Sequence, residues 1–123
     1  MKQFKHEPTG RQRFMGYSTN DKDVSIIFYG TDKIQGEIPH FHQDSNEVYL
    51  TTNGQGAIWI NGKVYRMRPG QPIKVEKGEP HMVLSVIRGP LEYYVIKTPD
   101  TSDDRIQIET PAELTDLLKK HNI

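Results

Sequence analysis

The 123-residue chain contains no cysteine and no long apolar run, and its charges balance. The absence of cysteine excludes disulfides, thiolate metal ligands and a cysteine nucleophile, and it is typical of a reducing compartment. Sixteen basic and sixteen acidic side chains are interspersed, so no charge excess predicts binding to nucleic acid or to an anionic membrane. No stretch approaches the roughly 18 apolar residues of a membrane span, and the opening segment lacks a signal-peptide pattern. We therefore expect a cytoplasmic protein whose partner is a small molecule.

Short strands separated by turn residues dominate the chain from Val24 onward, which is typical of an all-β fold. The expected strands span residues 24–30, 47–52, 56–60, 63–67, 71–76, 81–87, 91–97 and 105–109. Pairs that contain glycine separate them: Asn53-Gly54, Asn61-Gly62, Pro69-Gly70, Lys77-Gly78 and Gly89-Pro90. Because an Asn-Gly pair suits both central positions of a two-residue turn, residues 61 and 62 predict a β-hairpin.

The length fits a single domain, in which residues 24–109 form the β body. Residues 1–23 are polar, and we interpret them as an N-terminal arm that pairs with a sheet edge or with a second subunit. Residues 110–123 form a C-terminal helix and tail. This division predicts one compact β unit with a short extension at each end.

The signals for the C-terminal helix lie in the segment TPAELTDLLKK. Thr110 can cap the helix, Pro111 suits the first helical position, and Glu113 completes a capping box. Three leucines at helical spacing form an apolar stripe: Leu114, Leu117 and Leu118. We expect this stripe to pack on the outside of the β body.

Two histidines with one residue between them lie in the segment IPHFHQDSNEVYL, residues 38–50. Side chains alternate between the two faces of a strand, so His40 and His42 project to the same side. A polar, turn-forming segment follows, so Glu47 begins a new strand and its carboxylate can swing back toward the two imidazoles. Much later, His81 starts another strand after a Gly-Glu-Pro turn. Three imidazoles and one carboxylate would then converge from three strands.

This set of side chains suits a divalent transition metal: iron, manganese, nickel, copper or zinc rather than calcium or magnesium. Four protein ligands would leave one or two coordination positions open for a substrate oxygen or for dioxygen. The alternative is that the four residues only make hydrogen bonds within a metal-free barrel. His6 and His121 lie outside the pattern, and we expect them to be surface or hydrogen-bonded residues.

The same residues resemble the two sequence motifs of the cupin superfamily. In the first motif, His40, His42, Glu47 and Gly54 stand at the family's spacings, and only the leading glycine, Gly36, is displaced. In the second motif, Gly70, Gly78 and His81 match in register, whereas Glu76 replaces a proline and Ser85 replaces an asparagine. The departures fall on turn-forming and packing positions, and the positions that hold the metal in the family are all intact.

The resemblance implies a double-stranded β-helix, which is a jelly-roll barrel, over about residues 24–109. It also implies that His40, His42, Glu47 and His81 hold a metal inside the barrel mouth, and that the protein is a homodimer. Cupins include dioxygenases, decarboxylases, isomerases, epimerases, lyases, sugar-binding modules and storage proteins. The fold therefore does not decide the function.

Several other side chains are candidates for a role beside the metal. Tyr49 shares the strand face of the glutamate ligand, so it is either a general acid or hydrogen-bond donor, or a packing residue. Glu76 either caps the turn that leads to His81 or reaches into the cavity as an acid or base. Arg66 and Arg68 either clamp a carboxylate or phosphate, or lie on an exposed strand face. Trp59 lies in an apolar strand and is expected in the core.

Three hypotheses for function follow. The first is a metal-dependent enzyme acting on a small oxygenated metabolite such as a sugar, keto acid or diol, by dioxygenase chemistry or by isomerisation, epimerisation or decarboxylation. The second is a module that binds a small ligand, such as a sugar, without turnover. The third is a metal-free structural barrel. Nothing in the sequence resembles a phosphate-binding loop, a serine nucleophile elbow or a dinucleotide-binding fingerprint.

Overall fold

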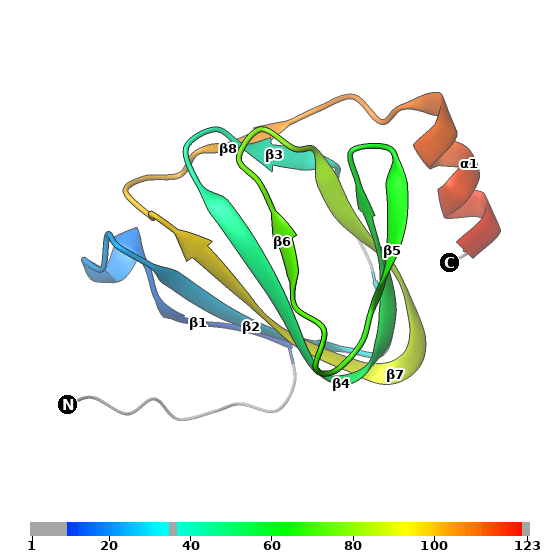
Figure 1. Cartoon of the computed structure of the whole chain (residues 1–123), viewed down its shortest axis with the longest axis horizontal. Helices are drawn as coiled ribbons and strands as arrows, with labels where there is room; N and C mark the ends of the chain where they lie inside the picture. Colours follow the sequence, from blue (N-terminus) through cyan, green and yellow to red (C-terminus); the bar gives the residue numbers. More distant parts are fainter. Residues whose placement is uncertain (1–9, 35–36, 122–123) are drawn as a thin grey trace.

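The computed structural model describes residues 10–34 and 37–121, which form one curled eight-stranded sheet and a C-terminal helix (Figure 1). The strands are β1 (Gly10–Met15), β2 (Ser25–Thr31), β3 (His40–His42), β4 (Asn46–Ile60), β5 (Lys63–Met67), β6 (Ile73–Val75), β7 (His81–Thr98) and β8 (Arg105–Gln107). A short 3-10 helix spans Tyr17–Thr19, and the helix α1 spans Ala112–His121. The predicted all-β jelly-roll fold with a short C-terminal helix is confirmed.

The two longest strands, β4 and β7, pair antiparallel along their lengths and carry the curvature of the sheet. The sequence predicted a turn at Asn53-Gly54 and a break at Gly89-Pro90, and both predictions are wrong, because each strand continues through these residues. Register shifts between residues 51 and 58 of β4 show how the chain accommodates them. Such irregularities bend a strand pair and increase its twist, so the sheet curls into a half-barrel.

Gly54 lies where β4 bends against β7, with a positive φ of 72°. A side chain there would meet the backbone carbonyl oxygens of Arg88 and Pro90. We therefore expect Gly54→Ala to lower the free energy of unfolding by more than about 2 kcal/mol, because left-handed strain and a backbone clash add together. Urea denaturation measures the loss.

Gly62 provides the matched control for this prediction. Its φ is also positive, at 94°, but no atom lies within 4 Å of the place where a Cβ would be. Gly62→Ala therefore reports the strain of the left-handed conformation alone. Equal losses of stability in the two variants would contradict the close approach at Gly54.

The predicted hairpin at Asn61-Gly62 is confirmed. Both residues have positive φ, 48° and 94°, and Ile60 pairs with Lys63 across the turn. Positive φ at both central positions is what an Asn-Gly pair tolerates better than other residues. The hairpin joins β4 to β5 and closes one side of the curl.

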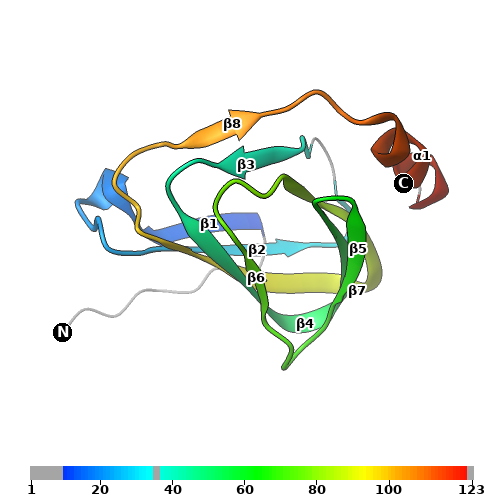
Figure 2. The same ribbon diagram turned by 45° about the horizontal axis from the view of Figure 1, so that its top comes forward.

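Residues 10–15 of the N-terminal arm form β1, which pairs antiparallel with β2 at the edge of the sheet. We expected the arm to pair with a sheet edge or with a second subunit, and residues 10–15 pair with a sheet edge. Residues 1–9 lie outside the described part of the chain. Arg11 stands opposite Tyr29 in this pairing, and Arg13 stands opposite Ile27. The arm therefore extends the wall of the half-barrel (Figure 2).

The alternating side chains of β4 and β7 supply two apolar clusters, one on each face of the sheet. The cluster inside the curl contains Tyr49, Ile58, Ile60, Met67, Val75, Val83, Leu91, Tyr93 and Val95. The outer cluster contains Ala57, Trp59, Met82 and Leu84, and the helix α1 covers it with Leu114, Leu117 and Leu118. The predictions that Trp59 is a core residue and that the leucine stripe packs outside the β body are confirmed.

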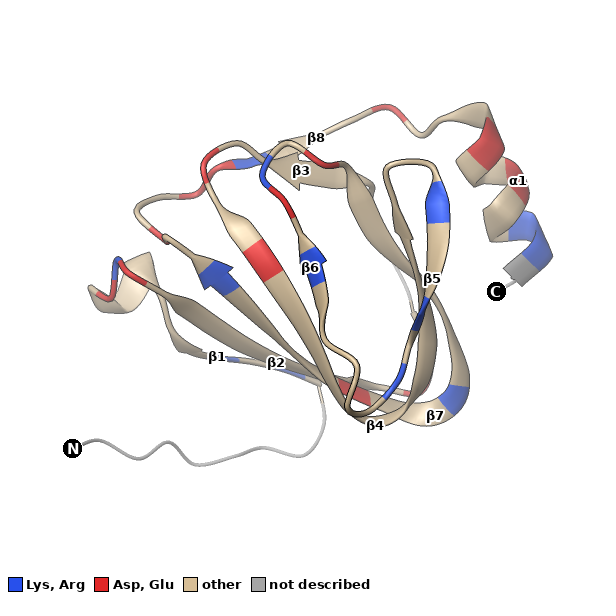
Figure 3. Ribbon diagram, in the orientation of Figure 1, with Lys and Arg blue, Asp and Glu red and all other residues tan. Residues whose placement is uncertain are grey.

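Charged residues of both signs lie on the same elements, as Figure 3 shows for β7 and α1. This distribution agrees with the balanced charge of the sequence. The helix α1 has ten residues, and none of the helices in the described residues is long and apolar enough to cross a membrane.

Candidate metal centre

The structure brings together all four predicted ligand residues at one end of the curled sheet. His40 and His42 come from β3, Glu47 from the start of β4, and His81 from the start of β7, where it pairs in register with His40. One possible ligand atom from each residue can be chosen so that all four lie within 4.8 Å of one another, and all four residues are buried. The alternation of faces along β3 places both of its histidines on the same side, as the sequence predicted.

Each imidazole is held by its Nδ1 and presents its Nε2. The Nδ1 of His40 and that of His81 each donate to a backbone carbonyl two residues earlier in the chain, at 2.9 Å. The Nδ1 of His42 donates to Oδ1 of Asp104 at 2.8 Å. Hydrogen bonding of the second nitrogen is the usual way in which proteins fix the tautomer and the orientation of a histidine that binds metal.

Glu47 lies between two of these rings. Its Oε1 is 2.8 Å from Nε2 of His81, and its Oε2 is 3.3 Å from Nε2 of His42. Burial disfavours the carboxylate, but hydrogen bonds from the two histidines outweigh burial and hold the pKa of Glu47 at about 2. The carboxylate is therefore ionised at neutral pH and available as an anionic ligand.

The two histidines of β3 differ in their protonation. Burial lowers the pKa of His40 to about 4, so its imidazole is neutral at neutral pH. Burial also disfavours the charged form of His42, but the carboxylates of Glu47 and Asp104 outweigh burial and raise the pKa of His42. The buried carboxylates therefore favour a positive charge beside them, which a proton on His42 or a bound cation can supply.

The donor set fits a first-row divalent metal. Metal–ligand bonds of about 2.1 Å place adjacent ligand atoms about 3 Å apart and opposite ones about 4.2 Å apart, so these four atoms need only small movements to share one ion. Three imidazoles with one carboxylate favour a transition metal over calcium or magnesium. The buried His/Glu group could therefore bind such a metal.

A buried charge network supports His42 from behind. Asp104 accepts the His42 hydrogen bond and also lies 2.7 Å from Nζ of Lys97. Burial disfavours the Asp104 carboxylate, but its contacts with Lys97 and His42 hold its pKa well below the ordinary value. Lys97 in turn lies 3.1 Å from Asp100, whose Oδ2 accepts a hydrogen bond from the backbone nitrogen of Tyr17. Sequence reasoning missed this network, because Asp104 is 62 residues from His42.

Asp104→Asn is expected to weaken metal binding by about 10- to 100-fold, because the amide keeps the size of the side chain but loses the charge that orients His42. Competition with a chromogenic chelator, well below the melting temperature, measures the affinity. Asp103→Asn is the matched control, since Asp103 is exposed and accepts a hydrogen bond from the backbone nitrogen of Arg105. Equal metal affinity in both variants would rule out the orienting role of Asp104.

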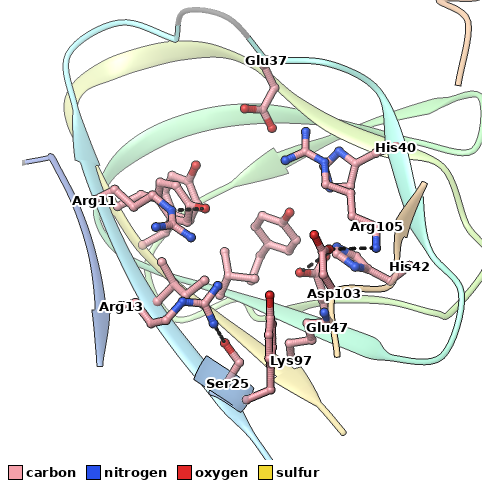
Figure 4. Close-up of a pocket in the computed structure, with 16 residues that line it drawn as sticks. Arg11, Arg13, Ser25, Glu37, His40, His42, Glu47, Lys97, Asp103 and Arg105 are labelled. Atoms are coloured by element: carbon pink, nitrogen blue, oxygen red, sulfur yellow. Dashed lines mark hydrogen bonds and ion pairs between the residues drawn. The ribbon is translucent and has the colours of Figure 1, made fainter. Parts of the chain in front are cut away.

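A cavity of about 250 Å³ opens beside the candidate ligands. Its wall includes three of them, His40, His42 and Glu47, and the cavity also reaches the tyrosines and charged side chains drawn in Figure 4. Small-molecule sites commonly have volumes of about 300 to 1,000 Å³, so this cavity is sized for a small metabolite. The candidate metal centre is therefore accessible to a ligand from one side.

Glu37 is a residue of this cavity that sequence reasoning missed. Figure 4 shows its carboxyl group pointing into the cavity from the wall opposite Lys97. Burial raises the pKa of Glu37, opposed by a hydrogen bond from the Val83 backbone and by the charge of Arg105. The only signal in the sequence was an acidic residue three positions before His40, and Glu37 lies before the start of β3, where the alternation of strand faces does not set its direction.

Tyr49 lines the cavity, as its shared face with Glu47 predicted. Its ring meets that of His81 edge-on, with 5.9 Å between the ring centroids. It also stacks on Tyr93 with a centroid separation of 5.9 Å, and Tyr93 stacks on Tyr29 with a separation of 5.2 Å. Burial, with a smaller contribution from Glu47, raises the pKa of Tyr49 well above its usual value. Tyr49 is therefore a neutral phenol, which can donate a hydrogen bond but cannot serve as a base near neutral pH.

The other candidates lie outside the cavity. Glu76 is exposed, pairs with Lys74 at 3.3 Å and is not among the residues that line the cavity, so the acid–base alternative for Glu76 has no support in this structure. Arg66 is exposed and donates to Gln55, and neither Arg66 nor Arg68 lines the cavity, which favours the exposed strand face over the clamp of the two alternatives. His6 and the side chain of His121 lie outside the described part of the chain.

The curled β-sheet, the buried His/Glu group and the adjoining cavity place this protein among small β-barrel proteins with a candidate metal centre. The chain belongs to the cupin family, because the family model for the cupin domain matches residues 30–97. That segment includes all four candidate ligands. Among curated proteins, no sequence matches this chain significantly.

Solved structures share the fold at low sequence identity. Streptomyces PAC13 with uridine superposes with a TM-score of 0.66 at 16% identity, covering 89% of this chain and 93% of that one. Another structure of Pac13 describes it as a nucleoside dehydratase. KdgF from Halomonas sp. gives a TM-score of 0.63 at 16% identity, covering 76% and 80%. A cupin protein from Bacteroides fragilis gives 0.66 at 14% identity, covering 92% of each chain. These similarities show the fold alone.

Proposed function

We propose that the protein is a metal-dependent cupin enzyme that moves a proton on a small oxygenated metabolite, as in isomerisation, epimerisation or dehydration. The observation that carries the proposal is that one cavity joins the His/Glu group to the carboxyl group of Glu37. A divalent transition metal held by His40, His42, Glu47 and His81 would act as a Lewis acid on a substrate oxygen.

Glu37 supplies the acid–base group in this proposal. A carboxyl group whose pKa is raised by burial is better matched to proton transfer near neutral pH than an ordinary glutamate. Its carboxylate would take a proton from the carbon next to the polarised oxygen. The proton would return to the opposite face of the same carbon in epimerisation, to the neighbouring carbon in isomerisation, or to the leaving hydroxyl group, released as water, in dehydration. Tyr49, as a neutral phenol, would donate a hydrogen bond to the same substrate.

The acid–base residue is the reason to prefer Lewis-acid chemistry over dioxygenase chemistry, which would not need a protonatable group in the cavity. The name of one structural neighbour, a nucleoside dehydratase, describes a reaction that also moves a proton, although its low identity to this chain transfers no substrate. The ion itself stays open among manganese, nickel, zinc, iron and copper.

The test is solvent-deuterium exchange. The metal-loaded protein is incubated in D2O with a panel of sugars, sugar acids and keto acids, and NMR follows deuterium entry while an electrode follows oxygen. We expect deuterium to enter a panel member at a carbon beside its carbonyl group without oxygen uptake, and chelation to stop the exchange. Oxygen uptake without exchange would replace the proposal by a dioxygenase. A ligand that binds and returns unlabelled would replace it by a binding module.

A further inference from the structure

The cavity beside the candidate metal centre is lined by more cations than its small size requires. Four cationic side chains reach it, Arg11, Arg13, Lys97 and Arg105, against three carboxylates. Figure 4 shows Arg11 and Arg13 on the β1 side, and Arg105 on the side of His40 and His42. Cations on two sides of a small cavity raise the local concentration of anionic ligands and hold them there.

Two of the four cations are neutralised within the protein. Lys97 lies 2.7 Å from Asp104 and 3.1 Å from Asp100. Arg13 lies 3.7 Å from the same Asp100 carboxylate and donates to the hydroxyl group of Ser25 at 3.2 Å. The charges of Lys97 and Arg13 therefore already have partners within the protein.

The other two cations, Arg11 and Arg105, differ in this respect. Within residues 10–34 and 37–121, neither guanidinium group is in an ion pair, and both residues are exposed. Arg11 is held in place by its Nε, which donates to the Tyr29 hydroxyl group at 3.2 Å, and by the Tyr29 ring, whose centroid is 5.7 Å from the guanidinium carbon. This leaves the outer nitrogens of Arg11 for a ligand.

Among the described residues, none of the three carboxylates of the wall forms an ion pair with Arg11 or Arg105. Glu47 contacts His42 and His81, and Asp103 accepts a hydrogen bond from the backbone nitrogen of Arg105 at 3.3 Å. Glu37 is a weak acid for a glutamate, because burial raises its pKa even though the charge of Arg105 opposes the rise. Both guanidinium groups are therefore available to pair with an anionic ligand.

A row of tyrosines connects Arg11 to the metal centre. Tyr29, under Arg11, stacks on Tyr93, which stacks on Tyr49, which contacts His81. A ligand lying along this wall would reach the candidate ligands with one end and Arg11 with the other. The arrangement fits a short molecule that has an oxygenated carbon at one end and an acidic group at the other.

We propose that the substrate is a small acid whose carboxylate or phosphate group is held in the cavity between Arg11, on the β1 side, and Arg105, on the side of His40 and His42. This proposal rests on the proposed function for the reaction at the other end of the substrate. Guanidinium groups bind carboxylates and phosphates with paired hydrogen bonds, so either acid satisfies the site. Neutral sugars of the same size would leave both arginines without a partner.

The test titrates the zinc-loaded protein at low ionic strength with malonate and, separately, with inorganic phosphate. Proton–nitrogen NMR follows the arginine Nε–H signals, and each signal is assigned by its loss in Arg11→Gln or Arg105→Gln. The same titrations are run on the parent protein freed of metal with a chelator. Arg66→Gln is the matched control, because Arg66 is exposed and lies outside the cavity.

We expect saturable binding of at least one anion, weakened about 10-fold or more by Arg11→Gln and by Arg105→Gln and unchanged by Arg66→Gln. The stronger of the two anions identifies the acidic group. Binding that survives chelation but not the arginine substitutions supports the subsite, even if the deuterium-exchange test of the proposed function fails. The subsite is overturned if neither anion saturates, if the arginine variants bind like the parent, or if chelation alone abolishes binding.

Discussion

Elemental analysis of the protein, purified without a histidine tag, will find about one equivalent of a divalent transition metal, and the His40→Ala/His81→Ala variant will contain none. The double substitution removes two of the four side chains whose ligand atoms lie within 4.8 Å of one another. The remaining pair, His42 and Glu47, would hold an ion with only two protein bonds. Two ligands are too few for the tetrahedral or octahedral sites that transition metals form in proteins.

The expected loss is large because the site is prepared for the ion before it arrives. All three imidazoles use Nδ1 for a hydrogen bond at 2.8 or 2.9 Å and present the other nitrogen. The pKa values of about 4 for His40 and about 2 for Glu47 mean that neither residue must release a proton to bind metal at neutral pH. Metal binding must still replace the contacts of Glu47 with Nε2 of His42 and His81, but the three rings are already oriented for the ion.

A His6→Ala/His121→Ala variant is the matched control, because it removes the same number of histidines from outside the four-residue group. It should keep the metal of the parent.

Chelation of the parent should also lower its melting temperature by roughly 5 to 15 °C, since a ligand at 100 times its Kd adds about 2.7 kcal/mol of stability to a domain of this size. A parent that stays metal-free after incubation with iron, manganese, nickel and zinc would overturn the proposed enzyme.

The candidate ligands could be predicted from the sequence because their geometry follows from local rules. Alternation along a strand puts His40 and His42 on one face whatever the rest of the fold does. The same alternation puts Tyr49 on the face of Glu47. The hairpin at residues 61 and 62 depends only on backbone preferences of Asn and Gly, and it too was predicted correctly.

The rest of the site depends on how the sheet curls, which local rules do not determine. Arg11 reaches the cavity because β1 pairs with the edge of β2, and Asp104 reaches His42 across 62 residues. The bulges that bend β4 and β7 occur at glycine and proline positions that also suit turns, so the sequence favoured strand ends there. Glu76 lies close to His81 in sequence, but it points outward and pairs with Lys74.

The second large effect is expected from Glu37→Gln, which should reduce turnover by about 100- to 10,000-fold without loss of metal. The amide keeps the size and polarity of the side chain but cannot accept a proton. Elemental analysis of the variant separates this result from a damaged metal centre. Glu109→Gln, at an exposed residue, is the matched control and should behave like the parent.

The pH dependence makes the assignment specific. The active form of Glu37 as a base is the carboxylate, so activity should fall as the pH drops through its pKa, and burial places that fall at higher pH than for an exposed glutamate. Arg105 favours the charged form, so Arg105→Gln should raise the pKa further and move the loss of activity to still higher pH. A residue that only shaped the cavity would leave the acidic limb where it is. If Glu37→Gln retained parental turnover, proton transfer would have to be assigned to another group.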